Sequence, residues 1–440
     1  MPSTLKWTPR VRLLSALCVL LFLALPARAH AHAVLVGADP AWGTTASTAP
    51  RAIRLVFDED VVPGLARVSV ISARGQDLAG VARVTGRVVM VPLHAVTSGS
   101  YTVRWRMVAS TDGHATEGAY SFGVDAKALA PAAARGVGVP VAPELLAWLQ
   151  FAGVVLAGGM LAFRALVIVP AARSAGARTA PGASVATAVA AAGAVVALHA
   201  GVLGFLAGAY PIVGGSLGDL VNTQIEPIRA GTHLGQAWTL MTFAWLGVLA
   251  LLVAAWVTPA KRERLLAYAG FCALGTAFGI SWASHPASHG APALAADYVH
   301  LLAGAIWVGA LVALVLSVTA ARALSNPERE AIARECFLRF SRGAVLIVVV
   351  VAGAGVFLAL SELRAPGLVL SSSYGVTLAL KSAFVLLALG LGGYHRRVVV
   401  PRLATGAPLS AMRSTLVLEL GFLALVLVFA AGLSQTAPPH

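Results

Sequence analysis

Eight long apolar segments occupy most of the chain after residue 143 of 440, and they constrain the fold more than any other feature. They cover about residues 144–170, 184–212, 236–258, 264–284, 294–321, 337–361, 373–394 and 414–433. Each is close to the roughly 20 apolar residues with which an α-helix crosses a lipid bilayer. Because only 11% of the residues are charged and 58% are hydrophobic, the composition excludes a wholly soluble protein. The sequence predicts an all-α polytopic membrane bundle of about eight transmembrane helices over residues 144–434.

The basic residues lie between these segments and form no continuous basic face. If the chain before the first helix is outside the cytoplasm, four connections are cytoplasmic, and these carry Arg173, Arg178, Lys261, Arg262, Arg264, Arg322, Arg329, Arg334, Arg396, Arg397 and Arg402. The connections on the other side hold only Arg229 and Arg364. This asymmetry follows the positive-inside rule. The net charge of +14 therefore indicates orientation in a bilayer and no nucleic-acid partner.

The first 31 residues have the pattern of a secretory signal peptide. Lys6, Arg10 and Arg12 precede the apolar run Leu13 to Leu25, and small residues follow in PARAHAHA. Cleavage before His30 or before His32 leaves a histidine at the new N-terminus in either case. The mature chain is expected to begin outside the cytoplasm.

Residues 32–126 change to short runs of strand length, AIRLVF, ARVSVISA, RVVMVPL, SYTVRWRMVAS and GAYSFGV, separated by turn residues. In one of them the large residues Tyr101, Val103, Trp105 and Met107 alternate with polar ones, which is typical of a strand with one buried face. The pattern predicts a small antiparallel β-sandwich. An Ala/Pro/Gly-rich stretch, residues 127–143, is predicted to link it to the bundle.

Three segments of the β-region, HAVLVGADPAWGT, LVFDEDV and GSYTVRWRMVASTDGHATEGAYSFGV, together resemble the CopC family of periplasmic copper-binding domains. The resemblance implies an all-β Greek-key sandwich of Ig-like or cupredoxin-like type. It also implies a Cu(II) site made by the mature N-terminal histidine, His32, and by Asp112 and His114 of a D-x-H turn. Glu59 stands where the family's strand ends in Ser-Glu, and it is either a further ligand or an exposed strand-end carboxylate.

The residue types of that set suit Cu(II), which prefers a tetragonal arrangement of nitrogen and oxygen ligands. A Cu(I) site would need soft thiolate or thioether ligands. Met90 and Met107 are the methionines of this region, and their strand positions predict that both are core residues. Cys18, Cys272 and Cys336 lie far apart in the chain and offer no disulfide framework.

The helical region resembles the CopD membrane family in DYVHLLAGAIWVGAL, FSRGAVLIVVVVAGAGVFLAL and SSSYGVTLALKSAFVLLALGLGGYHRR. A CopC module fused ahead of a CopD module implies a non-enzymatic protein of copper transport, homeostasis or resistance in the bacterial inner membrane. Its β-domain would lie in the periplasm, its cargo would be copper, and periplasmic copper carriers would be possible partners. The direction of transport, the energy source, the oligomeric state and the oxidation state of copper in the bundle are left open.

The stretch SWASHPASHGAPALAADYVH carries His285, His289 and His300 at one membrane face. We expect His285 and His289 to form a copper relay with His233 of the preceding loop, although Pro286 argues against one continuous helix through both. His300 lies deeper, where a polar side chain is costly and usually functional. His199, in the second helix, is its expected partner. The alternative for the loop histidines is simple solvation.

A second function remains open, in which His199 and His300 ligate b-type haem and the protein reduces Cu(II). The chain has no ATP-binding P-loop and no Cys-x-x-Cys metal motif, so nucleotide hydrolysis by this chain is not expected. Lys381 and Glu419 fall inside the last two apolar segments, and they are expected to form an ion pair because an unpaired charge is costly there.

Overall fold

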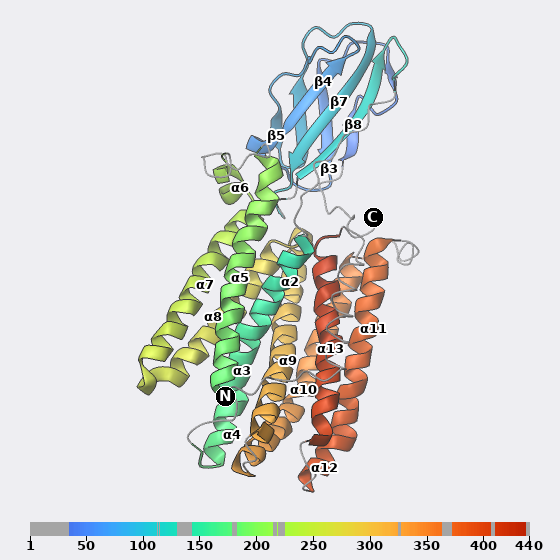
Figure 1. Cartoon of the computed structure of the whole chain (residues 1–440). Coiled ribbons are helices and arrows are strands. Elements are labelled where there is room, and N and C mark those ends of the chain that lie inside the picture. Colours follow the sequence, from blue (N-terminus) through green and yellow to red (C-terminus); the bar gives the residue numbers. More distant parts are fainter. Residues whose placement is uncertain are drawn as a thin grey trace.

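The computed structural model describes residues 35–111, 113, 115–129, 143–177, 183–213, 218, 225–323, 327–362, 372–405 and 410–436. The predicted signal peptide and three predicted copper ligands, His32, Asp112 and His114, lie outside the described residues. Figure 1 shows a β-sandwich that stands on one end of a helical bundle. This end is called the proximal end below, and the opposite end the distal end.

The sandwich consists of two four-stranded sheets, ordered β1-β3-β6-β5 and β2-β8-β7-β4. The strands are β1 (Leu35–Asp39), β2 (Thr45–Ala46), β3 (Ala52–Phe57), β4 (Arg67–Ser72), β5 (Arg83–Thr85), β6 (Val88–Pro92), β7 (Gly99–Val108) and β8 (Ala115–Val124), with a short helix η1 (Pro63–Leu65) before β4. All pairs are antiparallel except β2 with β8, which run parallel. The predicted β-sandwich is confirmed, with this one parallel pair as a difference.

The alternation along β7 positions the core of the sandwich. Tyr101, Val103 and Met107 are buried, Trp105 packs against the same core, and Arg104 between them is exposed. In β6 the same alternation buries Val89 and Val91, so the residue between them faces away from the core. Met90 lies between them and is 39% exposed, so the prediction that it is a core residue is wrong.

The helical elements are α2 (Pro143–Gly153), η2 (Val154–Gly159), α3 (Met160–Phe163), η3 (Arg164–Ile168), α4 (Val169–Ser174), α5 (Ala183–Ile212), α6 (Glu226–Gly231), α7 (His233–Val257), η5 (Pro259–Lys261), α8 (Arg262–Trp282), η6 (His285–His289), α9 (Ala291–Ala323), α10 (Pro327–Glu362), α11 (Ser373–Tyr394), η8 (His395–Val399), α12 (Val400–Ala404) and α13 (Ser410–Leu433). Within the described residues, eight helices are long and apolar enough to cross a membrane. This confirms the predicted number. The first of them runs through α2 to α4 and includes the π-helical turns η2 and η3.

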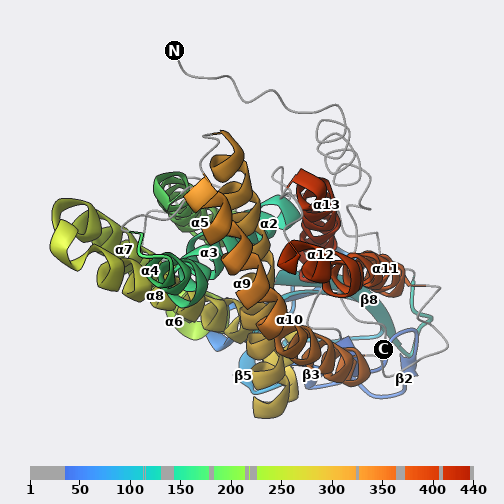
Figure 2. The ribbon, with the colours of Figure 1, turned by 90° about the horizontal axis from the view of Figure 1, so that it is seen from below.

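Helix α9 is the central element of the bundle, with α3, α8, α10 and α13 packed around it (Figure 2). Its closest approach is to the first span at Gly159, where a Cβ would lie 2.0 Å from the Ala305 carbonyl oxygen. Small residues allow membrane helices to pack this closely. The middle of α9 is therefore held directly against the first span.

Candidate functional site

The β-sandwich meets the bundle at Ser110, which follows strand β7. Its carbonyl oxygen accepts a hydrogen bond of 2.7 Å from the backbone N–H of His233, the first residue of α7. The backbone N–H of Ser110 donates to the Asp60 carbonyl oxygen at 2.9 Å, which brings the segment with Glu59 to the same junction. The predicted D-x-H turn starts two residues after Ser110. A histidine of the membrane domain thus lies beside the chain segment that carries two predicted copper ligands.

Gly113, the middle residue of that turn, lies against the bundle as well. A Cβ at this position would be 2.9 Å from Leu234 Cδ2 and 3.4 Å from Thr232 Oγ1. Thr232 is fully buried and caps α7, since its hydroxyl accepts a 2.9 Å hydrogen bond from the Gly235 N–H. The start of α7 is therefore rigid where it contacts the turn.

An apolar cluster holds the two domains together beside this contact. Its buried part includes Phe205, Val213 and Ile228, and Leu65 of the sandwich packs against it. Phe205 and Trp238 stack with their ring centroids 4.4 Å apart. Burial of Leu65 by membrane-domain residues stabilises the junction through the hydrophobic effect.

The His233 side chain is partly buried at this junction. Its Nδ1 is inaccessible to solvent and has no hydrogen-bond partner among the described residues. Its ring lies 5.4 Å from that of Trp282, the last residue of α8. A buried nitrogen without a partner is costly, so it is a candidate to bind a ligand.

His285 and His289 are the first and last residues of the 3₁₀-helix η6, which joins α8 to α9. The sequence left their approach undetermined because of Pro286, and the structure accommodates that proline in the first turn of η6. Residues four apart do not align in a 3₁₀-helix, which repeats after about three residues. The helix η6 itself packs on α8, α9 and α10.

His300 lies deeper in the bundle, between α9 and α10. Its Nδ1 is 2.9 Å from the Val351 carbonyl oxygen, and its ring lies against Gly355. One turn closer to the proximal end, Asp297 accepts a hydrogen bond of 3.1 Å from the Ser284 hydroxyl. Lys381 of α11 interacts electrostatically with both Asp297 and His300. The His300 imidazole, the Asp297 carboxylate and the Lys381 ammonium group thus form one group of interacting side chains between α9 and α11.

His199 does not join this group. Its side chain is exposed on α5, and its Nδ1 contacts the Val195 carbonyl oxygen of its own helix at 2.8 Å. The expectation that His199 and His300 face each other is therefore wrong. The haem alternative depended on this pair and has no support.

The expected ion pair between Lys381 and Glu419 is also wrong. Glu419 Oε2 lies 3.0 Å from His395 Nδ1, and both side chains are buried. Lys381 has Asp297 as its charged neighbour. The sequence shows that each charge needs a partner, but it does not show which helix faces provide one.

Among the described residues, no three His, Cys, Asp or Glu side chains are close enough together to hold a metal ion. Of the predicted ligands, His233 begins α7, His285 and His289 lie in η6, and His300 lies near the start of α9. Glu59 is partly buried at the domain junction. Sequence reasoning missed Ser110 and Lys381 as neighbours of these histidines, because neither belongs to a motif.

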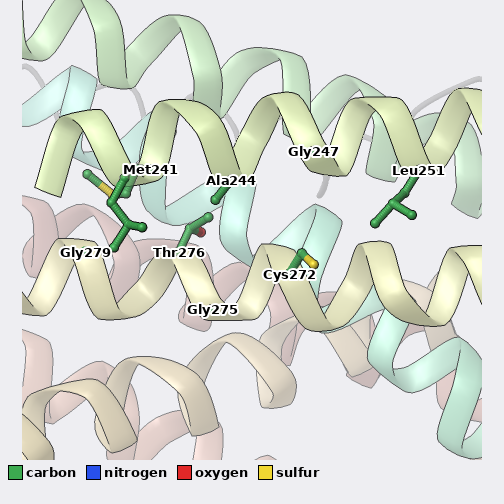
Figure 3. Close-up of a pocket in the computed structure, with 9 residues that line it drawn as sticks. Met241, Ala244, Gly247, Leu251, Cys272, Gly275, Thr276 and Gly279 are labelled. Carbon is green, nitrogen blue, oxygen red and sulfur yellow. The ribbon is translucent and has the colours of Figure 1, made fainter.

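A cavity of about 390 Å³ lies elsewhere, between α7 and α8 (Figure 3). Small and apolar residues line it, including Ala244, Gly247 and Gly275. Its two sulfur-bearing residues, Met241 and Cys272, extend from separate stretches of the two helices. The cavity offers no convergent set of soft ligands, and we do not assign the site to it.

Comparison with known proteins finds one family match in the β-sandwich and another in the last part of the helical bundle. The CopC domain family matches residues 35–125, and the family described as Copper resistance protein D matches residues 334–433. Copper resistance protein D of Pseudomonas syringae pv. tomato is 27% identical over 225 residues, which are 48% of this chain and 71% of that protein. Protein YobA of Escherichia coli strain K12 is 33% identical over 99 residues, which are 21% of this chain and 79% of that protein.

The crystal structure of CopC from Methylosinus trichosporium OB3b is also similar, at 29% identity, with a TM-score of 0.21. The match covers 21% of this chain and 93% of that chain. The β-sandwich, the eight apolar helices and the two family matches define a multi-pass membrane protein of copper resistance and transport. The chain carries a CopC domain at residues 35–125, followed by a helical region whose last part, residues 334–433, matches the CopD family.

Proposed function

We propose that the β-sandwich captures Cu(II) and delivers copper to the helical bundle through His233. The observation that carries this proposal is the hydrogen bond from the His233 backbone N–H to the Ser110 carbonyl oxygen. It holds the first residue of α7 beside the segment of Asp112 and His114, the proposed ligands together with His32 and, as a further donor, Glu59. The buried Nδ1 of His233 can then accept the ion as the outer ligands release it.

The onward path follows from the positions of the other histidines. Copper exchanges ligands more readily than it sheds them all, so stations within the bundle lower the barrier to entry. The His233 ring contacts Trp282, and His285 and His289 follow Trp282 in the chain. His300 lies deeper, about 10 Å along the α9 axis from Ala293 near the start of that helix, at roughly 1.5 Å per residue. His199 has no place in this path, because it faces away from the bundle.

Orientation in the inner membrane belongs to the same proposal. Helices α4 and α12, which carry Arg173 and Arg402, lie at the distal end, and so does the turn between α7 and α8, which is followed by Arg262 (Figure 1). Helix α6, with Arg229, lies at the proximal end. Under the positive-inside rule the distal end faces the cytoplasm. The CopC domain then lies in the periplasm, where soluble copper carriers can reach it.

Copper movement across vesicles that contain the full chain tests the proposal. We expect His114→Ala to remove tight Cu(II) capture, and we expect His233→Ala and His300→Ala to abolish copper flux while capture remains normal. His199→Ala is the matched control and should leave flux unchanged, because it removes an exposed membrane histidine outside the path. Wild-type flux through the His233/His300 double alanine variant would show that these histidines only pack the structure.

A further inference from the structure

A second buried pair of donor atoms lies toward the distal end of the bundle, apart from the junction. His395 begins the π-helical turn η8 after α11, and Glu419 belongs to α13. The exposed fractions of the two side chains are only 6% and 3%. π-helical turns inside α-helices are frequent at functional sites, because the wider turn redirects side chains.

The two donor atoms of the pair lie side by side in the interior. His395 Nδ1 and Glu419 Oε2 are 3.0 Å apart, a distance that suits a buried ion pair, and no other hydrogen-bond partner of Oε2 lies in the described part of the chain. Two ligands at about 2.1 Å from one metal ion are separated by about 3.0 Å when they subtend a right angle, as neighbouring ligands do in tetragonal Cu(II) sites. The spacing therefore lets one ion replace the proton between the two atoms without moving either side chain far.

The surroundings orient the imidazole for this role. His395 Nε2 lies 2.8 Å from Thr415 Oγ1, and the Phe337 ring packs edge-on with centroids 5.9 Å apart. A hydrogen bond at the second ring nitrogen is how proteins orient a metal-binding histidine. Thr415 thus directs Nδ1 toward Glu419.

A cavity of about 200 Å³ reaches the pair from between α9, α10 and α11. Ser341 and Arg396 line it together with His395 and Glu419. The cavity gives an ion and its water ligands access to the pair. The Arg396 guanidinium, which donates to the Ser341 carbonyl oxygen at 3.0 Å, carries a positive charge that opposes permanent retention of a cation.

We propose that His395 and Glu419 form a second copper site, which binds Cu(II) reversibly near the distal end of the bundle. The nitrogen and oxygen donors favour Cu(II) over Cu(I), and the remaining positions are left to water. The choice of copper as the metal rests on the proposed function, since copper is the ion that the bundle would carry. This site would be the last station before copper leaves the protein at that end.

Cu(II) titration of the purified full chain in detergent, with bound copper counted and followed by electron paramagnetic resonance, tests the site. We expect His395→Ala and Glu419→Gln each to lose one bound Cu(II) per chain together with its nitrogen hyperfine signal. The controls are His199→Ala, which removes an exposed membrane histidine, and Glu335→Gln, which removes a carboxylate paired with Arg339 on α10. Both controls should bind as much copper as the wild type.

Equal copper binding by the wild type, His395→Ala and Glu419→Gln would overturn the proposal and leave the pair as a packing interaction. If His395→Ala does not fold, Glu419→Gln decides the question, because the amide keeps the volume of the carboxylate. Thr415→Val should weaken copper binding and change the hyperfine signal without removing a ligand. The copper count and the flux experiment test different proposals. If His300→Ala loses copper flux but Glu419→Gln binds as much copper as the wild type, the second site is refuted and the proposed function is not.

Discussion

Gly113 is a residue of the β-sandwich side of the junction that has no room for a side chain. Its φ of +70° is in the left-handed region that favours glycine, and a Cβ would collide with Leu234. Gly43 has nearly the same φ, +75°, but no atom lies within 4 Å of a Cβ built there. An alanine at Gly43 would suffer backbone strain alone, whereas an alanine at Gly113 would suffer both backbone strain and crowding at the junction.

We expect Gly43→Ala and Gly113→Ala each to lower the free energy of unfolding of the sandwich by about 1–2 kcal/mol, the cost of a left-handed conformation. Only Gly113→Ala should also reduce copper flux, because the added methyl group pushes the turn away from α7. Thermal unfolding and vesicle flux measure the two effects. Leu234→Ala in the Gly113→Ala background should restore part of the flux, and equal flux in the two single variants would contradict a tight junction.

At the scale of the element, the short helix α6 and the start of α7 form one joint that carries His233. Thr232 holds it from both sides, since its hydroxyl donates to the Ile228 carbonyl oxygen at 2.7 Å and accepts from the Gly235 N–H at 2.9 Å. A helix that begins with a satisfied cap has a defined first residue. The cap thus determines where the His233 backbone N–H meets Ser110.

Thr232→Ala should remove this cap and lower the free energy of unfolding by about 0.5–2 kcal/mol. The first turn of α7 should fray, so that amide hydrogen exchange at His233 and Leu234 becomes faster. Thr232→Ser keeps the hydroxyl and serves as the matched control, with exchange close to that of the wild type. Protection of these amides that is unchanged in Thr232→Ala would mean that the contact with Ser110 alone orders the turn.

At the scale of the whole molecule, an even number of spans returns the chain to the side on which it starts. The sandwich and the end of α13 both lie at the proximal end, and the turn η5 between α7 and α8 lies at the distal end (Figure 1). The basic residues near η5 are Lys261, Arg262 and Arg264. Charge asymmetry and the count of helices therefore support the same orientation.

A reporter fused after His440 should be active outside the cytoplasm, and one inserted near Arg262 should be active inside. The reason is that positively charged connections are retained in the cytoplasm during insertion. Paired periplasmic and cytoplasmic reporters at each position measure this, with a fusion after the sandwich as the internal control. Activity of both fusions on the same side would contradict the eight-span topology.

The eight helices and the β-sandwich could be predicted because each follows from properties of a continuous stretch. Length and hydropathy suffice for a membrane span, and period-two alternation suffices for a strand such as β7. The same reasoning failed at Met90, since the face that a single residue occupies depends on the register of the neighbouring strands. The copper-binding residues implied for the D-x-H turn stay a prediction.

The sequence by itself determined the two-domain architecture, the number of spans and which histidines enter the membrane. Only the tertiary structure decided the partners: His233 with Ser110, Glu419 with His395, and Lys381 with Asp297. Helices that are apolar on nearly all sides carry no signal for their rotation about their own axes. Because each residue turns a helix by about 100°, a small change in packing exchanges one partner for another, which is why His199 faces outward and His300 faces α10.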